Sequence, residues 1–405
     1  MDLPLRAAAR PFSPAAATAL VPAGTRLLAL GEPTHGVEEF LDLRNALFRH
    51  LVAEHGYRSL ALESDCLAAL AVDAYVQGGD GELGAVVREG LSHGFGEYRG
   101  NRELIRWMRE FNEQSAEGEW LRLYGADGPL EITGAAAPGP ALLRLHDCLA
   151  ARLPAELLPA REELVLLHGP DARWTEPAAV RDPSRSVGRT PEAGRLRLLA
   201  DELAGTLAAH RPQFAAEDGG EALWRAESDA RTALGLLRYH AAVADAGPDR
   251  IGSLMRQRDL MMAENLRAIV RREDRRGPTL VFAHNRHLQR EASRIPLGDH
   301  QLRWWSAGAL FASHEDGYAH LACTFGNRGT DDRPDPDSLE GILTTLPDAR
   351  SVLDPRLLAA AVAGRAVARV PADHTYFGLD PDALGGVEGV LFVRDIPRQQ
   401  GLFGG

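Results

Sequence analysis

The sequence contains no lysine, since all 45 of its basic residues are arginine. This absence excludes Schiff-base chemistry on lysine, pyridoxal phosphate anchored to lysine, and the P-loop lysine that contacts phosphate. Cysteine is scarce as well: Cys66, Cys148 and Cys323 are far apart and form no CxxC pair. We therefore expect neither a thiolate zinc site nor a disulfide framework, and we expect the protein to act in the reducing cytoplasm.

Long hydrophobic runs and an excess of basic charge are also missing. No apolar stretch approaches the roughly 18–20 residues of a membrane span. Pro11 and Pro14 interrupt the alanine-rich N-terminal run, so a signal peptide is not expected. The 405 residues carry a net charge of −12. An acidic surface argues against nucleic acid or an anionic membrane as the partner, and a small-molecule substrate is expected.

Short apolar runs typical of strands buried on both faces are present. They are Arg26–Leu30, Ser59–Leu62, Leu121–Tyr124 and Thr279–Phe282. Helical patterns lie between the runs. This alternation predicts the α/β class, with a mostly parallel sheet core flanked by helices.

Residues 135–250 have a different character, because helical periodicity dominates them and a polar, proline-rich stretch over 169–194 predicts a long surface loop. We interpret 135–250 as a mostly helical insertion that forms a lid over the substrate. Residues 1–134 and 251–405 would then be the two parts of the α/β core.

Polar residues follow each predicted strand. Ligands bind beyond the carboxyl ends of parallel strands, so we expect these side chains to share one cleft. Any one of them alone would also serve as a loop polar group or a helix cap. The residues are Glu32 and His35 after the first strand, Glu63 and Asp65 after the second, Asp127 after the third, and His284, Arg286 and His287 after the fourth.

The helix predicted after His35 carries an arginine within its apolar stripe. The stripe consists of Val37, Phe40, Leu41, Leu47, Phe48, Leu51 and Val52, and Arg44 stands where the pattern calls for an apolar residue. A buried guanidinium costs several kcal/mol unless it is paired. We therefore expect a carboxylate, Glu32 or Glu63, beside Arg44. The alternative is an arginine at the edge of the stripe that extends to water.

Two other chemistries have weaker support in the sequence. His284 and His287 share a helix face, but structural zinc favours cysteine and catalytic zinc helices favour HExxH, so we expect no metal and no other cofactor. Gly90-Leu91-Ser92-His93-Gly94 matches the G-x-S-x-G nucleophile pattern. A charged, helix-like segment precedes Ser92 in place of the required strand, so we do not expect Ser92 to be a nucleophile.

Taken together, the motifs resemble the erythromycin esterase family over residues 20–330. The motifs that carry the resemblance are Gly31–Gly36 with Glu39, Phe40 and Arg44, then Leu62-Glu63, Trp107–Arg109 with Asn112, Gly125–Asp127, Arg258-Asp259 with Met262–Asn265, and Ala283–His287. The resemblance implies an α/β core with a helical insertion. It also implies a metal-independent hydrolase in which a histidine activates water against a macrolactone ester. Position by position it points to Glu32, His35, Arg44, Glu63, His284 and His287.

The chain departs from the family pattern at Pro33, at Ser64-Asp65-Cys66 and at Arg286, and these departures concern the substrate more than the chemistry. We expect His35 to act as general base, held by Glu32 or Glu63.

The remaining expected roles divide between the oxyanion and the substrate. Donors to the oxyanion would be His284, His287 and Arg44, and substrate contacts would come from Asp127, Asp65 and Arg286. The alternatives are a biosynthetic enzyme that uses the same base for cyclisation or acyl transfer, a metal-dependent hydrolase, and a non-catalytic binder.

Overall fold

The computed structural model describes residues 3–131, 134–216, 220–297, 300–370 and 376–398. Its centre is an eight-stranded sheet with the order β1-β11-β12-β10-β2-β7-β3-β4. In that order the strands are Ala9–Pro11, Arg350–Leu353, Gly389–Ile396, Tyr318–Arg328, Leu27–Glu32, Thr279–His284, Ser59–Asp65 and Arg122–Asp127. The strands from β12 to β4 are mutually parallel, whereas β11 is antiparallel to both β12 and β1.

The four predicted strands are confirmed as β2, β3, β4 and β7, which are almost wholly buried. Alternate residues serve the two faces of the sheet, as in Leu28 and Leu30 against Leu27 and Ala29. The strands extend further than their apolar runs, so Glu32 and His284 are their last residues. The predicted mostly parallel α/β core is confirmed.

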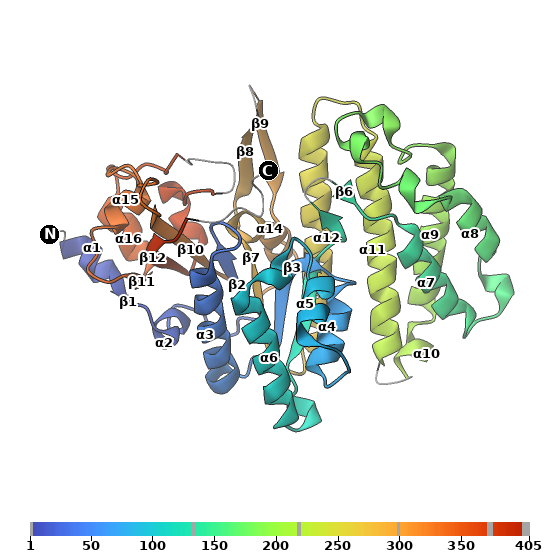
Figure 1. Ribbon diagram of the computed structural model, residues 1–405, viewed down its shortest axis with the longest axis horizontal. Helices are drawn as coiled ribbons and strands as arrows, with labels where there is room; N and C mark the ends of the chain where they lie inside the picture. Colours follow the sequence, from blue (N-terminus) through green and yellow to red (C-terminus); the bar gives the residue numbers. More distant parts are fainter. Residues whose placement is uncertain (1–2, 132–133, 217–219, 298–299, 371–375, 399–405) are drawn as a thin grey trace.

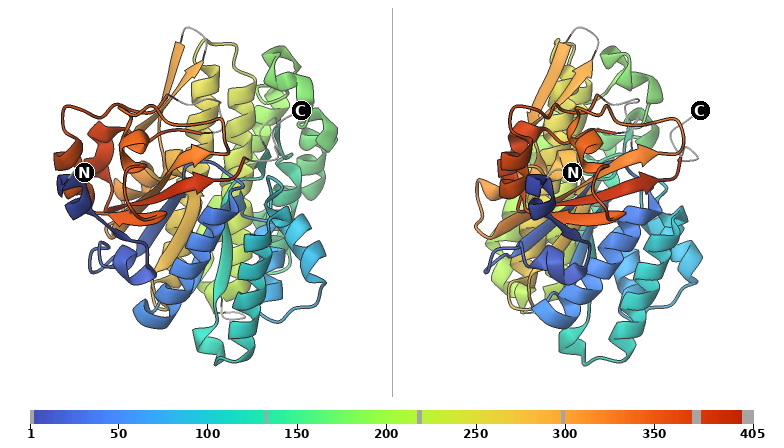
Figure 2. Two further views of the ribbon diagram at one scale, coloured as in Figure 1. Left: turned by 60° about the vertical axis from the view of Figure 1, so that its left-hand side comes forward. Right: turned by 90° about the vertical axis from the view of Figure 1, so that its left-hand side faces the viewer.

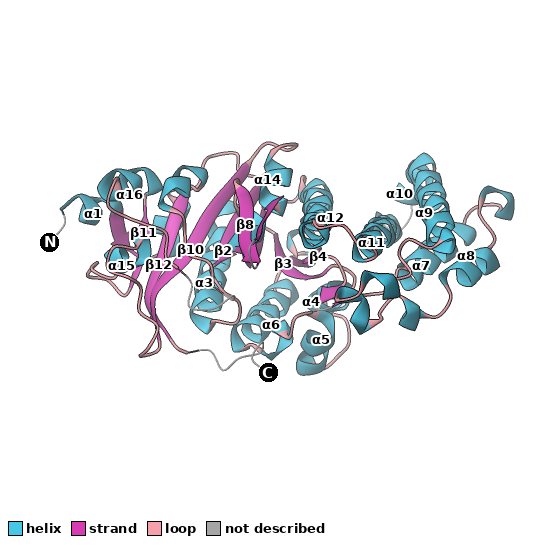
Figure 3. Cartoon of the chain, turned by 90° about the horizontal axis from the view of Figure 1, so that it is seen from above, coloured by secondary structure: helices cyan, strands magenta, loops and turns pink. Residues whose placement is uncertain are grey.

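Helices cover both faces of the sheet (Figure 3). On one face lie α3 (Glu38–His55), α4 (Ala69–Val76), α5 (Leu83–Gly90) and α6 (Arg99–Glu113). On the other face lie α12 (Arg250–Glu273) and α14 (Ala307–Ala312). The sheet is therefore enclosed, and only the ends of its strands are open to a ligand.

The predicted helical insertion is also confirmed. Its helices are α7 (Gly139–Ala150), α8 (Arg161–His168), α9 (Pro191–Ala209), α10 (Arg211–Ala215) and α11 (Glu221–Val243). They enclose a hydrophobic core of their own, which includes Leu145, Leu203 and Phe214, and α11 joins them to α12 (Figure 1). Residues 169–190 form a loop with three short 3-10 turns.

At the opposite end of the sheet, α1 (Leu3–Ala8), α15 (Leu339–Leu343) and α16 (Pro355–Val362) pack against β11 and β12 (Figure 2). The other regular elements include the short helices α2 (Pro14–Thr18) and α13 (Asn285–Leu288). Two antiparallel strand pairs lie outside the main sheet, β5 with β6 (Leu130–Glu131, Gly134–Ala135) and β8 with β9 (Ala292–Leu297, His300–Trp305). No helix in the described part of the chain is both long enough and apolar enough to cross a membrane.

Candidate active site

The carboxyl ends of β2, β7, β3 and β4 bring the predicted residues together. Glu32 pairs with His284 in the register of β2 and β7, and Asp65 pairs with Asp127 in that of β3 and β4. The turn after Glu32 returns His35 over the strand ends. Gly36 makes this turn possible with a φ of 75°, and a Cβ at this position would collide with the Tyr98 hydroxyl.

Glu32 and His35 form a closely bonded pair. His35 Nδ1 lies 2.7 Å from Glu32 Oε1, and the imidazole is 24% exposed while the Glu32 side chain is only 4% exposed. Burial raises the pKa of Glu32. Burial also opposes charge on His35, but Glu63 and the hydrogen bond to Glu32 outweigh it and raise the pKa of His35. The carboxylate fixes the ring orientation and stabilises the imidazolium form.

Glu63 is the most highly connected carboxylate of the site. Its Oε1 lies 2.8 Å from Arg258 Nη2, 3.3 Å from His287 Nε2 and 3.7 Å from His35 Nε2. Its Oε2 accepts a hydrogen bond of 2.7 Å from the His284 backbone N–H. Burial opposes the charge of Glu63, but these neighbours overcome it and lower its pKa. Glu63 therefore stays ionised between the two imidazoles.

Arg258 and Asp259, adjacent on α12, complete this network, although neither was among the predicted site residues. Arg258 donates to Asp127 Oδ2 through Nη2 at 2.7 Å and through Nε at 2.9 Å. Burial opposes its charge, but Asp127 and Glu63 raise the pKa of Arg258. The same pairing with Arg258 outweighs burial and lowers the pKa of Asp127. One guanidinium thus bridges two carboxylates from the neighbouring strands β3 and β4, and one negative charge remains uncompensated.

Asp259 orients a second histidine. Its Oδ1 lies 2.8 Å from His287 Nδ1 and also accepts from the Ala307 backbone N–H at 2.9 Å. Its Oδ2 accepts from the Trp304 indole at 2.5 Å. Burial opposes the charge of His287, but Asp259 and Glu63 raise its pKa. In the sequence, the role of Asp259 was indicated only by the Arg258-Asp259 pair among the motifs that carry the family resemblance.

His93 is a further residue that the sequence reasoning missed. It lies in the G-x-S-x-G segment with a φ of 58°, and its Nε2 is 3.5 Å from Asp127 Oδ2. Phe95 separates its ring from that of His35, with centroids 5.5 and 5.4 Å away respectively. Interpreting this segment only as a possible serine nucleophile obscured its histidine.

His284 joins the cluster, but its ring is already fully bonded. Nδ1 accepts from the Arg286 backbone N–H at 3.1 Å, which places the proton on Nε2, and Nε2 donates to the Pro33 carbonyl at 3.1 Å. Burial, followed by the charge of His35, lowers the pKa of His284 well below its usual value. In this arrangement His284 is neutral and holds the turn that carries His35.

Arg44 is buried as predicted, with 1% exposure, but the expected ion pair is not formed. Its guanidinium donates to the amide oxygens of Asn101 at 2.7 Å and Asn45 at 2.8 Å, and to the Gly100 carbonyl. The amide dipoles replace a carboxylate as its partners. Burial lowers the pKa of Arg44 to about 10, and the charge of Glu32 is the largest effect that opposes this shift. Arg44 lies beneath the site and supports Glu32 electrostatically.

The last two predicted residues lie at the margin of the cluster. Asp65 Oδ1 accepts from the Leu67 and Ala68 backbone N–H groups, and burial raises the pKa of this carboxyl. The Arg286 guanidinium lies over the Phe377 ring, 4.9 Å from its centroid. Burial lowers the pKa of Arg286. Both residues flank the cluster without joining the Glu63 network.

The serine of the G-x-S-x-G pattern has a structural role. Ser92 Oγ accepts from the Asp65 backbone N–H at 3.0 Å, and α5, not a strand, precedes it.

Burial raises the pKa of the Cys66 thiol to about 12. Within the described residues, no group of three or more His, Cys, Asp or Glu side chains is arranged to hold a metal ion.

Comparisons with known proteins agree with this architecture. A family model described as erythromycin esterase matches residues 52–386. The fold is similar to that of a Bacillus cereus protein (TM-score 0.72, 19% identity, 98% of this chain and 97% of that chain). It is similar to a succinoglycan biosynthesis protein (TM-score 0.70, 18% identity, 97% and 96%). It is also similar to a mutant of erythromycin esterase EreC in its open conformation (TM-score 0.66, 19% identity, 96% and 94%).

Proposed function

This chain belongs to the erythromycin esterase family, and we propose that it is a metal-independent hydrolase that cleaves a lactone or another ester with water activated by His35. The observation that carries the proposal is the 2.7 Å contact between His35 Nδ1 and Glu32 Oε1 beside a partly exposed imidazole. A base held in one tautomer by a buried carboxylate is the arrangement that general-base catalysis requires.

In the proposed reaction, a water oxygen attacks the acyl carbon while its proton moves to His35. The imidazolium that forms is stabilised by Glu32 and by Glu63, 3.7 Å from Nε2. The new carbon–oxygen bond gives a tetrahedral oxyanion. The carbon–oxygen bond to the alcohol then breaks, and the proton returns from His35 to the leaving alkoxide. The net change is one ester plus one water to one acid plus one alcohol.

Arg258 and His287 are the proposed donors toward the oxyanion. Arg258 Nη2 donates to Glu63 Oε1, and His287 Nε2 lies 3.3 Å from the same oxygen, so a reacting oxygen next to that carboxylate would lie near both groups. Arg258 and His287 would exchange contacts with Glu63 for the oxyanion. Donation by His284 or Arg44, as expected from the sequence, would instead break bonds that hold the Pro33 turn and the helices of Arg44 and Asn101 in place. For these two residues we propose supporting roles.

For substrate binding, we keep Asp127, Asp65 and Arg286 as proposed contacts, because Asp127 belongs to the Arg258 network and the other two flank the cluster. We propose that the helices of 135–250 cover the substrate, since α11 packs on the helix that carries Arg258. We propose that the protein acts in the cytoplasm, since its three cysteines are widely spaced in the sequence. Macrolactones are the first substrates to test, in view of the family.

The test is a panel of macrolactones and simple esters, followed by mass spectrometry of the products. We expect at least one substrate to gain the mass of one water. His35→Ala should lose turnover by about 10²–10⁴-fold or more, because it lacks the base. His314→Ala removes an exposed histidine at the end of α14 and should leave the rate unchanged. A fully active His35→Ala variant would overturn the assignment.

A second candidate function uses the same base on a substrate hydroxyl or amine, giving cyclisation or acyl transfer. One neighbour in fold is named as a succinoglycan biosynthesis protein, and the His35 side chain is only 24% exposed, which limits access of water. Product mass distinguishes the two, since cyclisation adds no water. A metal-dependent hydrolase would lose activity on dialysis against a chelator, and a non-catalytic binder would bind the panel without turnover.

A further inference from the structure

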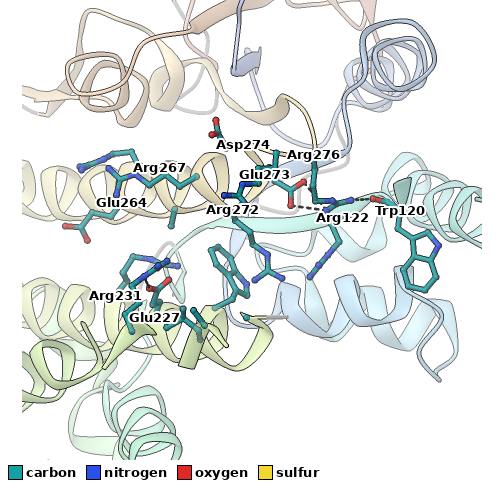
Figure 4. A pocket seen from close by; sticks show the side chains of 18 of the residues that line it. Trp120, Arg122, Glu227, Arg231, Glu264, Arg267, Arg272, Glu273, Asp274 and Arg276 are labelled. Atoms are coloured by element: carbon teal, nitrogen blue, oxygen red, sulfur yellow. Dashed lines mark hydrogen bonds and ion pairs between the residues drawn. The ribbon is translucent and has the colours of Figure 1, made fainter. Parts of the chain in front are cut away.

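A large hollow lies at the end of the sheet opposite to the candidate active site. Asp127, in the active site, ends β4, and Arg122, in the hollow, begins it, so the two are separated by roughly 17 Å of strand. The hollow has a volume of about 1180 Å³ and lies between α11, α12 and the turn before β4 (Figure 4). It is built largely from arginine, with eight arginines and five acidic residues in its lining.

Most of these charges are already paired. Three of the acidic residues form ion pairs with arginines: Glu227 with Arg211, Glu264 with Arg238, and Glu273 with Arg276. Arg272 likewise forms an ion pair with Glu221, which does not line the hollow. These pairs leave few carboxylates to satisfy a further cation.

Arg231 on α11 is a partly buried exception. No carboxylate of the described residues lies within ion-pair distance of it. Its Nε donates to Asn265 Oδ1 at 3.3 Å and its Nη2 donates to Ser228 Oγ at 3.0 Å, while its Nη1 has no acceptor among the described residues. Burial lowers the pKa of Arg231. An unpaired, partly buried guanidinium is costly, and a ligand anion would remove that cost.

Further donors border the same hollow. The Trp224 side chain is 7% exposed, and its indole N–H has no acceptor within the described chain. Arg231 and Arg272 both lie over this ring, 5.2 and 4.7 Å from its centroid, so two like charges share one indole. Arg267 of α12, labelled in Figure 4, makes no hydrogen bond to a described residue through its buried Nε, which lies 3.8 Å from Glu315 Oε1 in a long ion pair.

We propose that this hollow is a second binding site, which takes a small molecule through its phosphate or carboxylate oxygens, with Arg231 as the main anchor. Two of the donors that border it, Arg231 Nη1 and the Trp224 indole N–H, lack acceptors among the described residues, and an oxyanion supplies several acceptors at once. The hollow is larger than inorganic phosphate requires and is suited to a metabolite with an extended body. Its arginines contrast with the net charge of −12 on the whole chain.

The test measures anion binding to the full-length protein by calorimetry and by thermal unfolding in phosphate-free buffer at low salt. Inorganic phosphate and pyrophosphate probe phosphate oxygens, and citrate probes carboxylates. We expect at least one probe to bind in the millimolar range or more tightly and to raise the unfolding temperature. Arg231→Gln should weaken that binding about tenfold or more. Arg197→Gln, which removes an exposed arginine from α9, should not change it.

The unliganded variants separate a binding role from a structural one. Arg231 has no carboxylate partner, so Arg231→Gln should unfold at the same or a higher temperature than the unsubstituted chain when no anion is present. Labelling of arginine with phenylglyoxal provides a readout without substitution, since the anion should protect Arg231 but not Arg197. The proposal is overturned if none of the three probes binds, if Arg231→Gln binds as well as the unsubstituted chain, or if Arg231 is not protected.

Discussion

Glu32→Gln tests the central feature of the site, because it removes the charge that faces His35 but keeps the side-chain shape. The carboxylate lies 2.7 Å from His35 Nδ1. A charge-assisted hydrogen bond of this kind contributes about 1.5–3 kcal/mol, and one pKa unit corresponds to about 1.4 kcal/mol. We therefore expect the pKa of His35 to fall by about one to two units in the variant.

The sign of this shift can be read from a pH–rate profile. A general base acts only when it is deprotonated, and kcat/KM reports the ionisation of the free enzyme. The raised pKa of His35 places the acid limb of the unsubstituted chain above the ordinary histidine value of 6.5. In Glu32→Gln that limb should move to lower pH. Its plateau should fall by about 10²–10⁴-fold, because the ring loses its orienting partner and some of its basicity.

The assay uses the best ester from the substrate panel, with kcat/KM measured across the pH range. Glu54→Gln, an exposed substitution near the end of α3, is the matched control and should reproduce the original profile. An acid limb that stays in place, or moves to higher pH, would refute the idea that Glu32 sets the protonation of His35. An unchanged plateau would refute its role in orienting the base.

Three further predictions concern stability and the rejected nucleophile. Arg258→Leu leaves Glu63 and Asp127 without their shared cation and should lower the free energy of unfolding, measured with urea, by about 3–5 kcal/mol. The control Arg256→Leu breaks an exposed pair on the same helix and should lower it by about 1 kcal/mol or less. Equal losses in the two variants would contradict the buried network. The neighbours of Glu63 lower its pKa, so its charge should stabilise the fold above about pH 4.5, and this stabilisation should be lost as the pH falls. The free energy of unfolding should therefore depend less on acid pH in Glu63→Gln. An unaltered dependence would argue against the lowered pKa. Ser92→Ala should retain activity within a few-fold, and a loss of about 10⁴-fold or more would restore the serine as nucleophile.

The sheet was readable from the sequence because its central strands are buried on both faces. Runs such as Ser59–Leu62 and Thr279–Phe282 are apolar at nearly every position, and the polar residues that follow mark where the strands end. Strand β10 was not identified, although it lies at the centre of the sheet between β12 and β2. Its residues Tyr318–Arg328 mix small, polar and aromatic side chains, so no apolar run marks it.

The candidate site was predictable only where side chains follow strands. Arg258 and Asp259 reach the site from the middle of a long helix, and helical periodicity does not reveal which polar positions face a strand end. Arg44 illustrates a different limit. The apolar stripe predicted its burial correctly, but besides the adjacent Asn45 its partners are Asn101 and the backbone of Gly100, some 56 residues away in sequence. Partners at such separation depend on how helices pack, which a single sequence does not encode locally.

The charge balance of the site has a consequence for the substrate. Four carboxylates face two guanidiniums, so the site has an excess of negative charge that protonated histidines offset. The carboxylates are Glu32, Glu63, Asp127 and Asp259, and the guanidiniums are Arg44 and Arg258. The raised pKa values of His35 and His287 are the expression of this excess of negative charge.

When His35 gives up its proton to become a base, the site gains one negative charge. A neutral or cationic ester can approach such a site, whereas an anionic one is repelled. Hydrolysis then produces a carboxylate, and the same repulsion favours its release. We therefore expect neutral or cationic esters to show higher kcat/KM than matched anionic esters, with a difference that shrinks as salt is added. A preference for anionic esters would show that the carboxylates of this network do not govern access to His35.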